Sequence, residues 1–256
     1  MFKDIEYIGG LGTGKCNMAK NDPKRFMIRA IMGGTHLGIA VMLAYTFGCL
    51  LYPINEALCR IAMAACFGFG VVLTINLGAE LYIGNCFTTL IPLYNKQVSI
   101  KDVLRVLAYS FIGNTIGNFG FIALFMQTGS HQALFKPFIE WVIVERLNYS
   151  VFPLLIKAIL AGYLVAISIY ASQKCKDETN KFMIITVCIL CYVLATFQNC
   201  TVNVGVFTCG WFALGNSVDV WANLPLHMLI VTIGNTIGAG LMLAYPVYEI
   251  FKETKN

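Results

Sequence analysis

Charged residues are scarce in this sequence. Aspartate, glutamate, lysine and arginine make up 12% of its 256 residues, about half of the roughly 25% found in soluble domains. This scarcity excludes a soluble protein with an ordinary charged surface. Hydrophobic residues reach 58% and the mean hydropathy is +0.71, and several apolar stretches have the ~20 residues that cross a bilayer core. The sequence therefore predicts an all-α membrane protein.

Residues that support catalysis or metal binding are also few or isolated. The chain has three histidines, and the lone pair Cys188 and Cys191 has no second pair with which to bind a metal. The segment "GGLGTGKC" at 9–16 has the spacing of a phosphate-binding loop but ends in Cys16, where a hydroxyl ligand for Mg²⁺ is required. No nucleophile stands beside a base. We therefore expect no enzyme, no cofactor and no metal.

Six apolar segments are expected to span the membrane, three in each half of the chain. An odd number of crossings reverses the second half, so the halves form an inverted repeat of the kind common in transporters. We assign the repeats to residues 26–130 and 131–250, between tails at 1–25 and 251–256. The second and fifth segments lose their apolar character midway and are expected to be broken. The segments start and end near residues 26–52, 61–96, 103–126, 151–171, 182–215 and 224–248.

Lysine and arginine predict the orientation. Of the 18 basic residues, 14 fall on the side of the termini, three on the other side, and Lys157 within a span. Because basic residues favour the cytoplasmic side, both termini are expected in the cytoplasm, and the membrane is expected to be the plasma membrane. The net charge of +5 is then a signal of topology, and no nucleic-acid partner is expected. The 14 are Lys3, Lys15, Lys20, Lys24, Arg25, Arg29, Lys96, Lys101, Arg105, Lys174, Lys176, Lys181, Lys252 and Lys255, and the three are Arg60, Lys136 and Arg146.

The hexapeptide "IGNTIG" occurs at 112–117 and again at 233–238. The copies fall at corresponding places in the third span of each half. Their glycines, four residues apart, allow two helices to approach closely in lipid. Asn114 and Asn235 are expected to form hydrogen bonds across such an interface, although they could also line a solute path. The motif is more typical of architecture than of chemistry.

The two broken spans carry the stronger functional signal. Polar and glycine-rich backbone at membrane depth is tolerated where it is buried in protein or lines a watery cavity, and paired breaks point to a solute site near the midplane. The breaks are "GAELYIGN" at 78–85 and "QNCTVNVG" at 198–205. The first contains Glu80, Gly84 and Asn85. Glu80 either has a functional role or is held by loose backbone N–H groups of the break.

Lys157 is the basic residue expected inside a span. It follows Pro153 in "FPLLIKAILAG" near the outer end of the fourth span. A cation at a pore mouth concentrates anions. The alternative is a lysine whose ammonium group reaches the lipid headgroups, and the sequence leaves both possibilities open.

These features resemble the formate/nitrite transporter family. The resemblance rests on the two inverted halves and on "GAELYIGN", "KAILAGYLV" at 157–165 and "FQNCTVNVG" at 197–205, and it covers residues 25–246. It implies an aquaporin-like fold and a homopentamer in which each subunit has its own pore. Members of this family move small monovalent weak-acid anions such as formate, acetate, lactate, nitrite or hydrosulfide.

The chain departs from the family pattern at the pore centre. Where members usually read Phe-Glu-His, this chain reads Phe197-Gln198-Asn199, so the central histidine is replaced by Asn199. Ile83 stands at a usual threonine. By the resemblance, Lys157 attracts the anion and the pore centre contains Asn199, Gln198, Thr201, Asn203 and Ile83. The apolar constrictions would contain Phe67, Val71 and Tyr192 on one side and Leu81, Tyr82 and Val165 on the other, although each could be a plain packing residue.

Asn199 limits the mechanism. Histidine exchanges a proton near neutral pH, whereas a carboxamide can only form hydrogen bonds. We expect Lys157 to attract the anion and the low dielectric of the vestibule to raise the substrate's pKa, so that the solute takes a proton from water and crosses as the neutral acid. The expected partners are the anion, the proton and lipid. A channel for neutral solutes (hydrogen sulfide, water or undissociated acids) and a non-transporting membrane protein are the alternatives.

Overall fold

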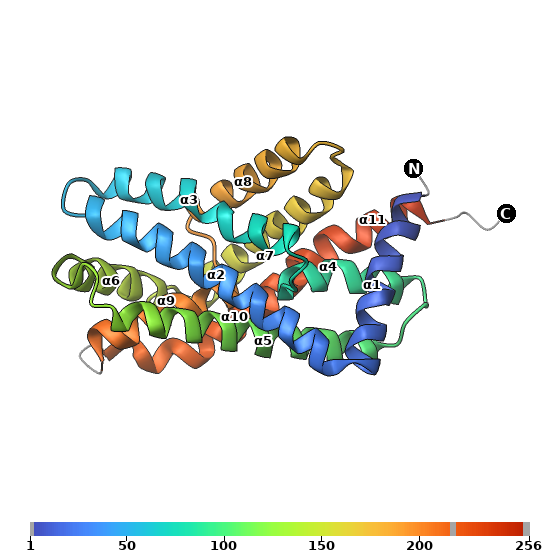
Figure 1. Cartoon of the computed structure of the whole chain (residues 1–256), viewed down its shortest axis with the longest axis horizontal. Coiled ribbons are helices and arrows are strands. Elements are labelled where there is room, and N and C mark those ends of the chain that lie inside the picture. Colours follow the sequence, from blue (N-terminus) through green and yellow to red (C-terminus); the bar gives the residue numbers. More distant parts are fainter. Residues whose placement is uncertain (1–2, 216–218, 253–256) are drawn as a thin grey trace.

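The computed structural model describes residues 3–215 and 219–252, and every regular element in these ranges is helical (Figure 1). The expected C-terminal tail lies partly outside them, since 253–256 are not described. The elements of the first half are α1 (Lys3–Asn21), α2 (Pro23–Leu51), α3 (Glu56–Asn76), α4 (Tyr82–Tyr94) and α5 (Ile100–Gln127). Those of the second half are α6 (Gln132–Leu147), α7 (Val151–Lys174), α8 (Glu178–Leu194), α9 (Cys200–Leu214), η1 (Asp219–Asn223), α10 (Leu224–Ile237), the π-helical η2 (Gly238–Ala244) and α11 (Tyr245–Phe251).

The helices have the lengths and composition of membrane-crossing segments. Five are long and apolar enough to cross, namely α2, α3, α5, α7 and the continuous stretch Trp221–Ile250. The second and fifth expected segments are interrupted as the sequence predicts, because α3 and α4 are separate helices, and so are α8 and α9. Helices α8 and α9 have 17 and 15 residues, fewer than the roughly 20 that a crossing helix typically needs.

The N-terminal segment, expected as a tail at 1–25, forms a helix. Helix α1 ends at Asn21, and α2 begins at Pro23 after Asp22, whose side chain accepts a hydrogen bond from the Arg25 backbone N–H. An aspartate N-cap followed by proline is a favourable helix start. Helix α1 packs against α4 and α5, and Cys16 and Ala19 are buried there with Phe26, Val103 and Val106.

Helix α6 was not predicted either, because it lies between the third and fourth expected segments, at 103–126 and 151–171. It occupies the same place in the second half as α1 does in the first. It precedes α7 as α1 precedes α2, and it packs against α9 as α1 packs against α4. The two halves therefore correspond, with α6–α9 matching α1–α4 and the continuous stretch Trp221–Ile250 matching α5.

The repeated hexapeptide lies at two equivalent helix contacts. A Cβ atom on Gly117 would lie 2.0 Å from the Ile31 carbonyl oxygen of α2, and one on Gly238 would lie 2.0 Å from the Ile159 carbonyl oxygen of α7. Neither position can hold a side chain, so α5 contacts α2, and α10 with η2 contacts α7, at backbone distance. The small-residue packing expected from the sequence is confirmed.

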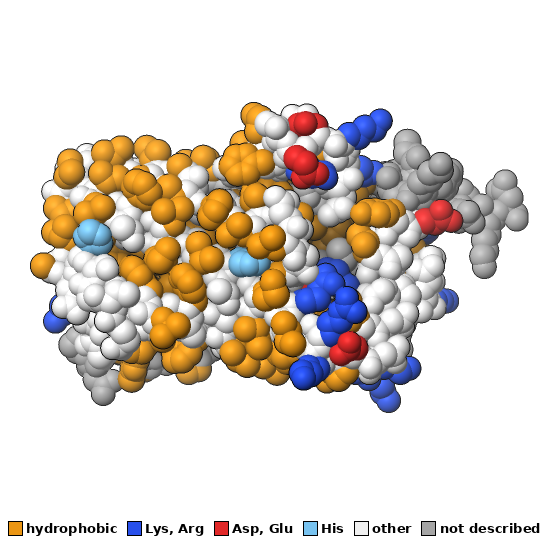
Figure 2. Space-filling model, in the orientation of Figure 1, with side chains coloured by type: hydrophobic (Ala, Val, Ile, Leu, Met, Phe, Trp, Pro, Cys, Tyr) orange, Lys and Arg blue, Asp and Glu red, His pale blue; other side chains and the backbone are white. Residues whose placement is uncertain are grey.

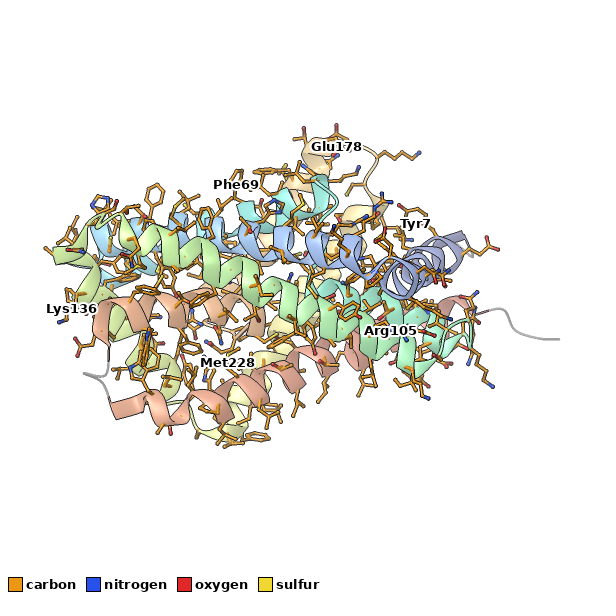
Figure 3. All side chains as sticks on the ribbon, turned by 60° about the horizontal axis from the view of Figure 1, so that its bottom comes forward. Tyr7, Phe69, Arg105, Lys136, Glu178 and Met228 are labelled. Carbon is orange, nitrogen blue, oxygen red and sulfur yellow. The ribbon has the colours of Figure 1, made fainter. Side chains whose placement is uncertain are left out.

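Charged and apolar side chains are distributed unevenly along the long axis of the molecule. Helices α1 and α11 lie at one end (Figure 1), and Lys136 lies at the opposite end from Tyr7 and Arg105 (Figure 3). Figure 2 shows hydrophobic side chains over much of the visible face and basic side chains mainly toward the end with α1 and α11. This distribution agrees with the charge asymmetry in the sequence.

Candidate functional site

Asn114 of the first hexapeptide holds the first break together. Its Nδ2 donates to the carbonyl oxygens of Ala30 and Glu80, both at 2.8 Å. Its Oδ1 accepts from the Tyr82 backbone N–H at 3.0 Å. The side chain is fully buried, so this one carboxamide satisfies three backbone groups around the break.

Asn235 of the second hexapeptide repeats this arrangement at the second break. Its Nδ2 donates to the carbonyl oxygens of Ala158 and Gln198, both at 2.8 Å. Its Oδ1 accepts from the Cys200 backbone N–H at 2.8 Å. The hydrogen bonds across the interface that the sequence favoured are present in both halves. They also give a correspondence by position, in which Gln198 of the second break matches Glu80 of the first.

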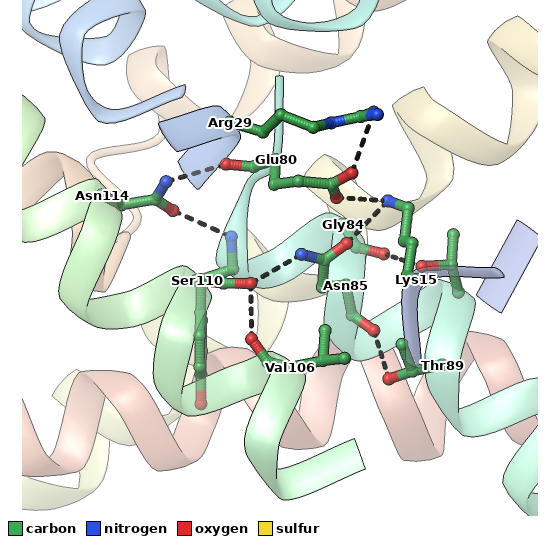
Figure 4. A network of polar contacts seen from close by, with 11 residues as sticks. Lys15, Arg29, Glu80, Gly84, Asn85, Thr89, Val106, Ser110 and Asn114 are labelled. Atoms are coloured by element: carbon green, nitrogen blue, oxygen red, sulfur yellow. Dashed lines mark hydrogen bonds and ion pairs between the residues drawn. The ribbon is translucent and has the colours of Figure 1, made fainter. Parts of the chain in front are cut away.

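The first break also contains two ion pairs, both formed by Glu80 (Figure 4). Glu80 has a side-chain exposure of 1%, and its Oε2 lies 2.8 Å from the Lys15 Nζ while its Oε1 lies 3.1 Å from the Arg29 Nη2. Lys15 also donates to the Asn85 Oδ1 at 2.7 Å, and the Asn85 Nδ2 donates to the Ser110 Oγ at 2.6 Å. The carboxylate is thus held by two cations from α1 and α2, and not by the backbone N–H groups that the sequence suggested.

A cavity of about 220 Å³ lies beside these ion pairs, and we call it the first-break cavity. It is bordered by α1, α2, α3, α4, α7 and the break itself, and Lys15, Arg29, Glu80, Leu81 and Gly84 are among its lining residues. Lys15 could not be found from the sequence, because it belongs to a segment interpreted as a tail, 70 residues from Asn85.

Asn199 caps helix α9 at the second break. Its Oδ1 accepts from the backbone N–H groups of Thr201 and Val202 at 3.0 and 3.2 Å and from the Thr201 hydroxyl at 3.1 Å. These are the bonds of an asparagine N-cap. Because the carbonyl oxygen is occupied, Nδ2 is the atom of this side chain that can donate to a solute.

Beyond Asn199, an arginine from α6 enters the second break. The Arg146 Nη1 donates to the Gln198 Oε1 at 2.7 Å and to the Asn203 Oδ1 at 2.8 Å. The Asn203 Nδ2 faces Gln198 and lies 3.0 Å from the His227 Nε2. Since this Nδ2 is the donor, the His227 Nε2 accepts and carries no proton. Neither Arg146 nor His227 was expected here, because neither is near 198–205 in sequence.

Lys157 lies at the edge of the same break. Its Nζ donates to the Thr196 hydroxyl at 2.6 Å and sits 4.6 Å from the centre of the Tyr149 ring. The ammonium group thus faces protein groups at the start of the break. Arg146, and not Lys157, contacts the carboxamides of Gln198 and Asn203 among the described hydrogen bonds.

A small cavity of about 50 Å³ opens beside Arg146, and we call it the second-break cavity. Arg60 and Glu145 form an ion pair in its wall, with the Arg60 Nη2 2.8 Å from the Glu145 Oε2. Burial acts to raise the pKa of Glu145, but the hydrogen bond and charge of Arg60 outweigh burial and hold this pKa below its usual value. Glu145 is therefore ionised at neutral pH. The lining residues are Arg60, Met63, Trp141, Val142, Glu145, Arg146, Tyr149, Val193, Thr196 and Gln198.

The expected constriction residues are buried, and some of them meet. The rings of Phe67 and Tyr192 pack edge to face with centroids 6.3 Å apart. The Tyr82 hydroxyl lies 2.8 Å from the Thr236 Oγ1. Val71, Leu81 and Val165 are also buried, and so is Ile83, which was expected at the pore centre. In the described residues, no group of three or more His, Cys, Asp or Glu is placed to hold a metal ion.

Two interrupted helices, each held by a matching asparagine and each flanked by cations and a cavity, define a membrane transporter or channel. Residues 5–248 match the sequence profile of the family described as formate/nitrite transporter. The chain belongs to this family, and it is a transmembrane transporter and not an enzyme.

Individual relatives agree with this assignment, and solved structures share the fold. The nitrite transporter NirC of Salmonella typhimurium is 26% identical over 240 residues, which cover 91% of this chain and 87% of that protein. The formate-nitrite transporter of Plasmodium falciparum is 21% identical, with coverage of 89% and 78%. A structure described as an FNT family ion channel superposes with a TM-score of 0.89 at 21% identity, covering 98% of this chain and 99% of that one. A pentameric formate channel with formate bound has a TM-score of 0.77 at 16% identity, with coverage of 91% and 99%.

Proposed function

We propose that this protein moves small monovalent weak-acid anions across the membrane together with a proton, as the neutral acid. The class comprises formate, acetate, lactate, nitrite and hydrosulfide. The single observation that carries the proposal is the paired break, with Lys15, Arg29 and Glu80 at the first and Arg146 and Lys157 at the second. Family membership supports the same class of substrate.

The transport step follows from charge and dielectric. Cations at each break attract the anion, and the apolar wall between the breaks disfavours a bare charge and raises the pKa of the bound acid. The acid takes its proton from water in the cavity, because a carboxamide at position 199 cannot supply one. The Asn199 Nδ2 then donates a hydrogen bond to the passing solute.

The other pore residues have the following roles in this proposal. Gln198, Thr201, Asn203 and Ile83 form the pore centre with Asn199. Gly84 and Asn85 shape the first break beside Glu80. The apolar constrictions are formed by Phe67, Val71 and Tyr192 toward the second-break cavity and by Leu81, Tyr82 and Val165 toward the first-break cavity.

The proposed topology has six crossings. Helices α3 and α4 together make the second, and α8 and α9 together make the fifth, which yields inverted repeats at 26–130 and 131–250. Both termini lie on the cytoplasmic side of the plasma membrane. The first-break cavity then faces the cytoplasm, and the second-break cavity faces the cell exterior. We also propose a homopentamer in the lipid bilayer, supported by the likeness to a pentameric channel.

A channel for neutral solutes such as hydrogen sulfide, water or undissociated acids is the second candidate. The replacement of the family's central histidine by Asn199, and the apolar Ile83 where a threonine is usual, favour it. The two candidates differ in whether flux depends on protons.

Uptake into proteoliposomes separates them. We expect labelled formate, acetate or lactate to enter faster at about pH 5.5 than at about pH 7.5, because protonation precedes crossing. Lys157→Ala is expected to slow uptake of the anion, and Lys136→Ala, which removes a charge from exposed surface at the same end, serves as its control. Uptake that ignores pH, or that appears only after Asn199→His, would support the neutral-solute channel instead.

A further inference from the structure

The two breaks correspond residue by residue, but their charges differ. At the first, Lys15 donates to the Asn85 Oδ1 and pairs with Glu80. At the second, Arg146 donates to the Asn203 Oδ1 and to Gln198. Asn85 follows Glu80 by five residues, as Asn203 follows Gln198. Each break thus has a cation that contacts an asparagine and one further side chain. That further side chain is Glu80 at the first break and Gln198 at the second.

This replacement leaves Arg146 without a carboxylate in direct contact among the described residues, and Glu145, whose ion pair is with Arg60, acts on it only through its charge. Gln198 supplies a carbonyl oxygen but no negative charge, and no carboxylate pairs with Arg146 in the part of the chain that the structure describes. The neighbouring Glu145 is already paired with Arg60. A guanidinium group is always protonated, and the partly buried Arg146 keeps its positive charge at the break with only neutral hydrogen-bond partners in the described ranges. The second break therefore favours an anion from solution.

The space beside Arg146 suits a small anion. The second-break cavity measures about 50 Å³, and about 10–15 Å³ by the same measure holds one water molecule. Formate and nitrite have three heavy atoms and fit such a space.

Arg146 also retains donors for such an anion. Guanidinium has five N–H groups, of which Nη1 makes the two bonds to Gln198 and Asn203 and Nη2 one long bond of 3.4 Å to the Tyr45 hydroxyl. A planar fork of N–H groups matches the two oxygens of a carboxylate or of nitrite.

We propose that Arg146 binds the substrate anion directly at the second break and that Gln198 keeps this site open by not neutralising it. Lys157, held by Thr196 and Tyr149, adds to the attractive field without contacting the bound anion. This inference rests on the proposed function, since it names the residue of that site that binds the substrate.

Three variants test the site. Arg146→Gln removes the charge, Gln198→Glu supplies the counter-charge found at the first break, and Lys136→Gln removes one exposed charge from the same helix. The half-saturation concentration for formate uptake is measured at about pH 7.5, where formate is an anion. We expect Arg146→Gln to raise it at least tenfold, which corresponds to about 1.4 kcal/mol of binding. Gln198→Glu is expected to raise it severalfold, and Lys136→Gln to leave it within about twofold.

A binding measurement keeps this test separate from that of the proposed function. Formate is added to the purified protein, and its effect on the unfolding temperature is measured for the same variants. A rise in wild type that is lost in Arg146→Gln and Gln198→Glu supports the site, even if no formate enters vesicles, in which case the proposed function fails alone. Equal behaviour of Arg146→Gln and Lys136→Gln in both assays overturns the inference. If Arg146→Gln does not fold, the Gln198→Glu variant provides the test. Wild-type behaviour of Gln198→Glu in both assays also overturns the inference.

Discussion

At the scale of single residues, the chemistry of the carboxamide explains why asparagine stands in both hexapeptides. At each break the asparagine meets two carbonyl oxygens, one from the break and one from the packed helix α2 or α7, and one N–H group from the break. Asparagine has two N–H donors and an acceptor oxygen on one short side chain. Aspartate offers only acceptors and leucine offers neither. Asn114 and Asn235 are therefore fixed by what the backbone of each break needs.

We expect Asn114→Asp and Asn235→Asp each to destabilise the protein by about 2–6 kcal/mol. The substitution keeps the shape but directs a carboxylate at two buried carbonyl oxygens, and each lost donor costs about 1–3 kcal/mol. Thermal unfolding in detergent measures the loss. Asn180→Asp is the matched control, because Asn180 is exposed in the first turn of α8, where a negative charge is favourable. Similar melting temperatures for all three variants would contradict this role.

At the scale of elements, two helix pairs come close enough for backbone atoms to touch. Gly113 and Gly117 place α5 on α2, while Gly234 and Gly238 place α10 and η2 on α7. This close approach lets a short asparagine reach across to the break. The sequence predicted these contacts because glycines four residues apart share a helix face. The π-helical turn that follows Gly238 in the second half has no such signature and was not expected.

Gly117→Ala is expected to abolish or strongly reduce folded protein. The added methyl group would lie 2.0 Å from the Ile31 carbonyl oxygen, so the two helices would have to separate and Asn114 would lose its partners. Gly120→Ala, one turn further along α5, meets nothing within 4 Å and should stabilise the helix by up to about 1 kcal/mol. The yield of monodisperse protein and its unfolding temperature measure both effects. A Gly117→Ala protein as stable as Gly120→Ala would disprove the close contact.

At the scale of the whole molecule, the sequence predicted what depends on local composition and missed what depends on distant contacts. Apolar length predicted the crossing helices, and polar residues within them predicted both breaks. Lys15 and Arg146 were missed because positive-inside counting treats basic residues as markers of a loop, whereas these two extend into the breaks. Arg146 is 52 residues from Gln198 in sequence, and no pattern in a single sequence links them.

A second distant contact, the ion pair between Lys15 and Glu80, joins the N-terminal helix α1 to the centre of the protein. The Lys15 side chain is 22% exposed and the Glu80 carboxylate 1%, so their ion pair lies between a surface pair, worth about 0–1 kcal/mol, and a buried one, whose disruption costs about 3–5 kcal/mol. We expect Lys15→Gln to destabilise the protein by about 1–3 kcal/mol and to make α1 more susceptible to protease, because Glu80 then has only Arg29 as an ion-pair partner. Unfolding temperature and limited proteolysis measure these two effects.

The control and the double variant decide whether Glu80 is the cause. Lys20→Gln removes an exposed charge from the last turn of the same helix and should cost at most about 1 kcal/mol through the helix dipole. Adding Glu80→Gln to Lys15→Gln removes the carboxylate that Lys15 neutralised, so the double variant should lose less stability than the sum of the two single variants. Strict additivity would mean that Lys15 supports α1 through contacts other than Glu80. A positive coupling would show that the first break and the N-terminal helix are stabilised by one shared charge pair.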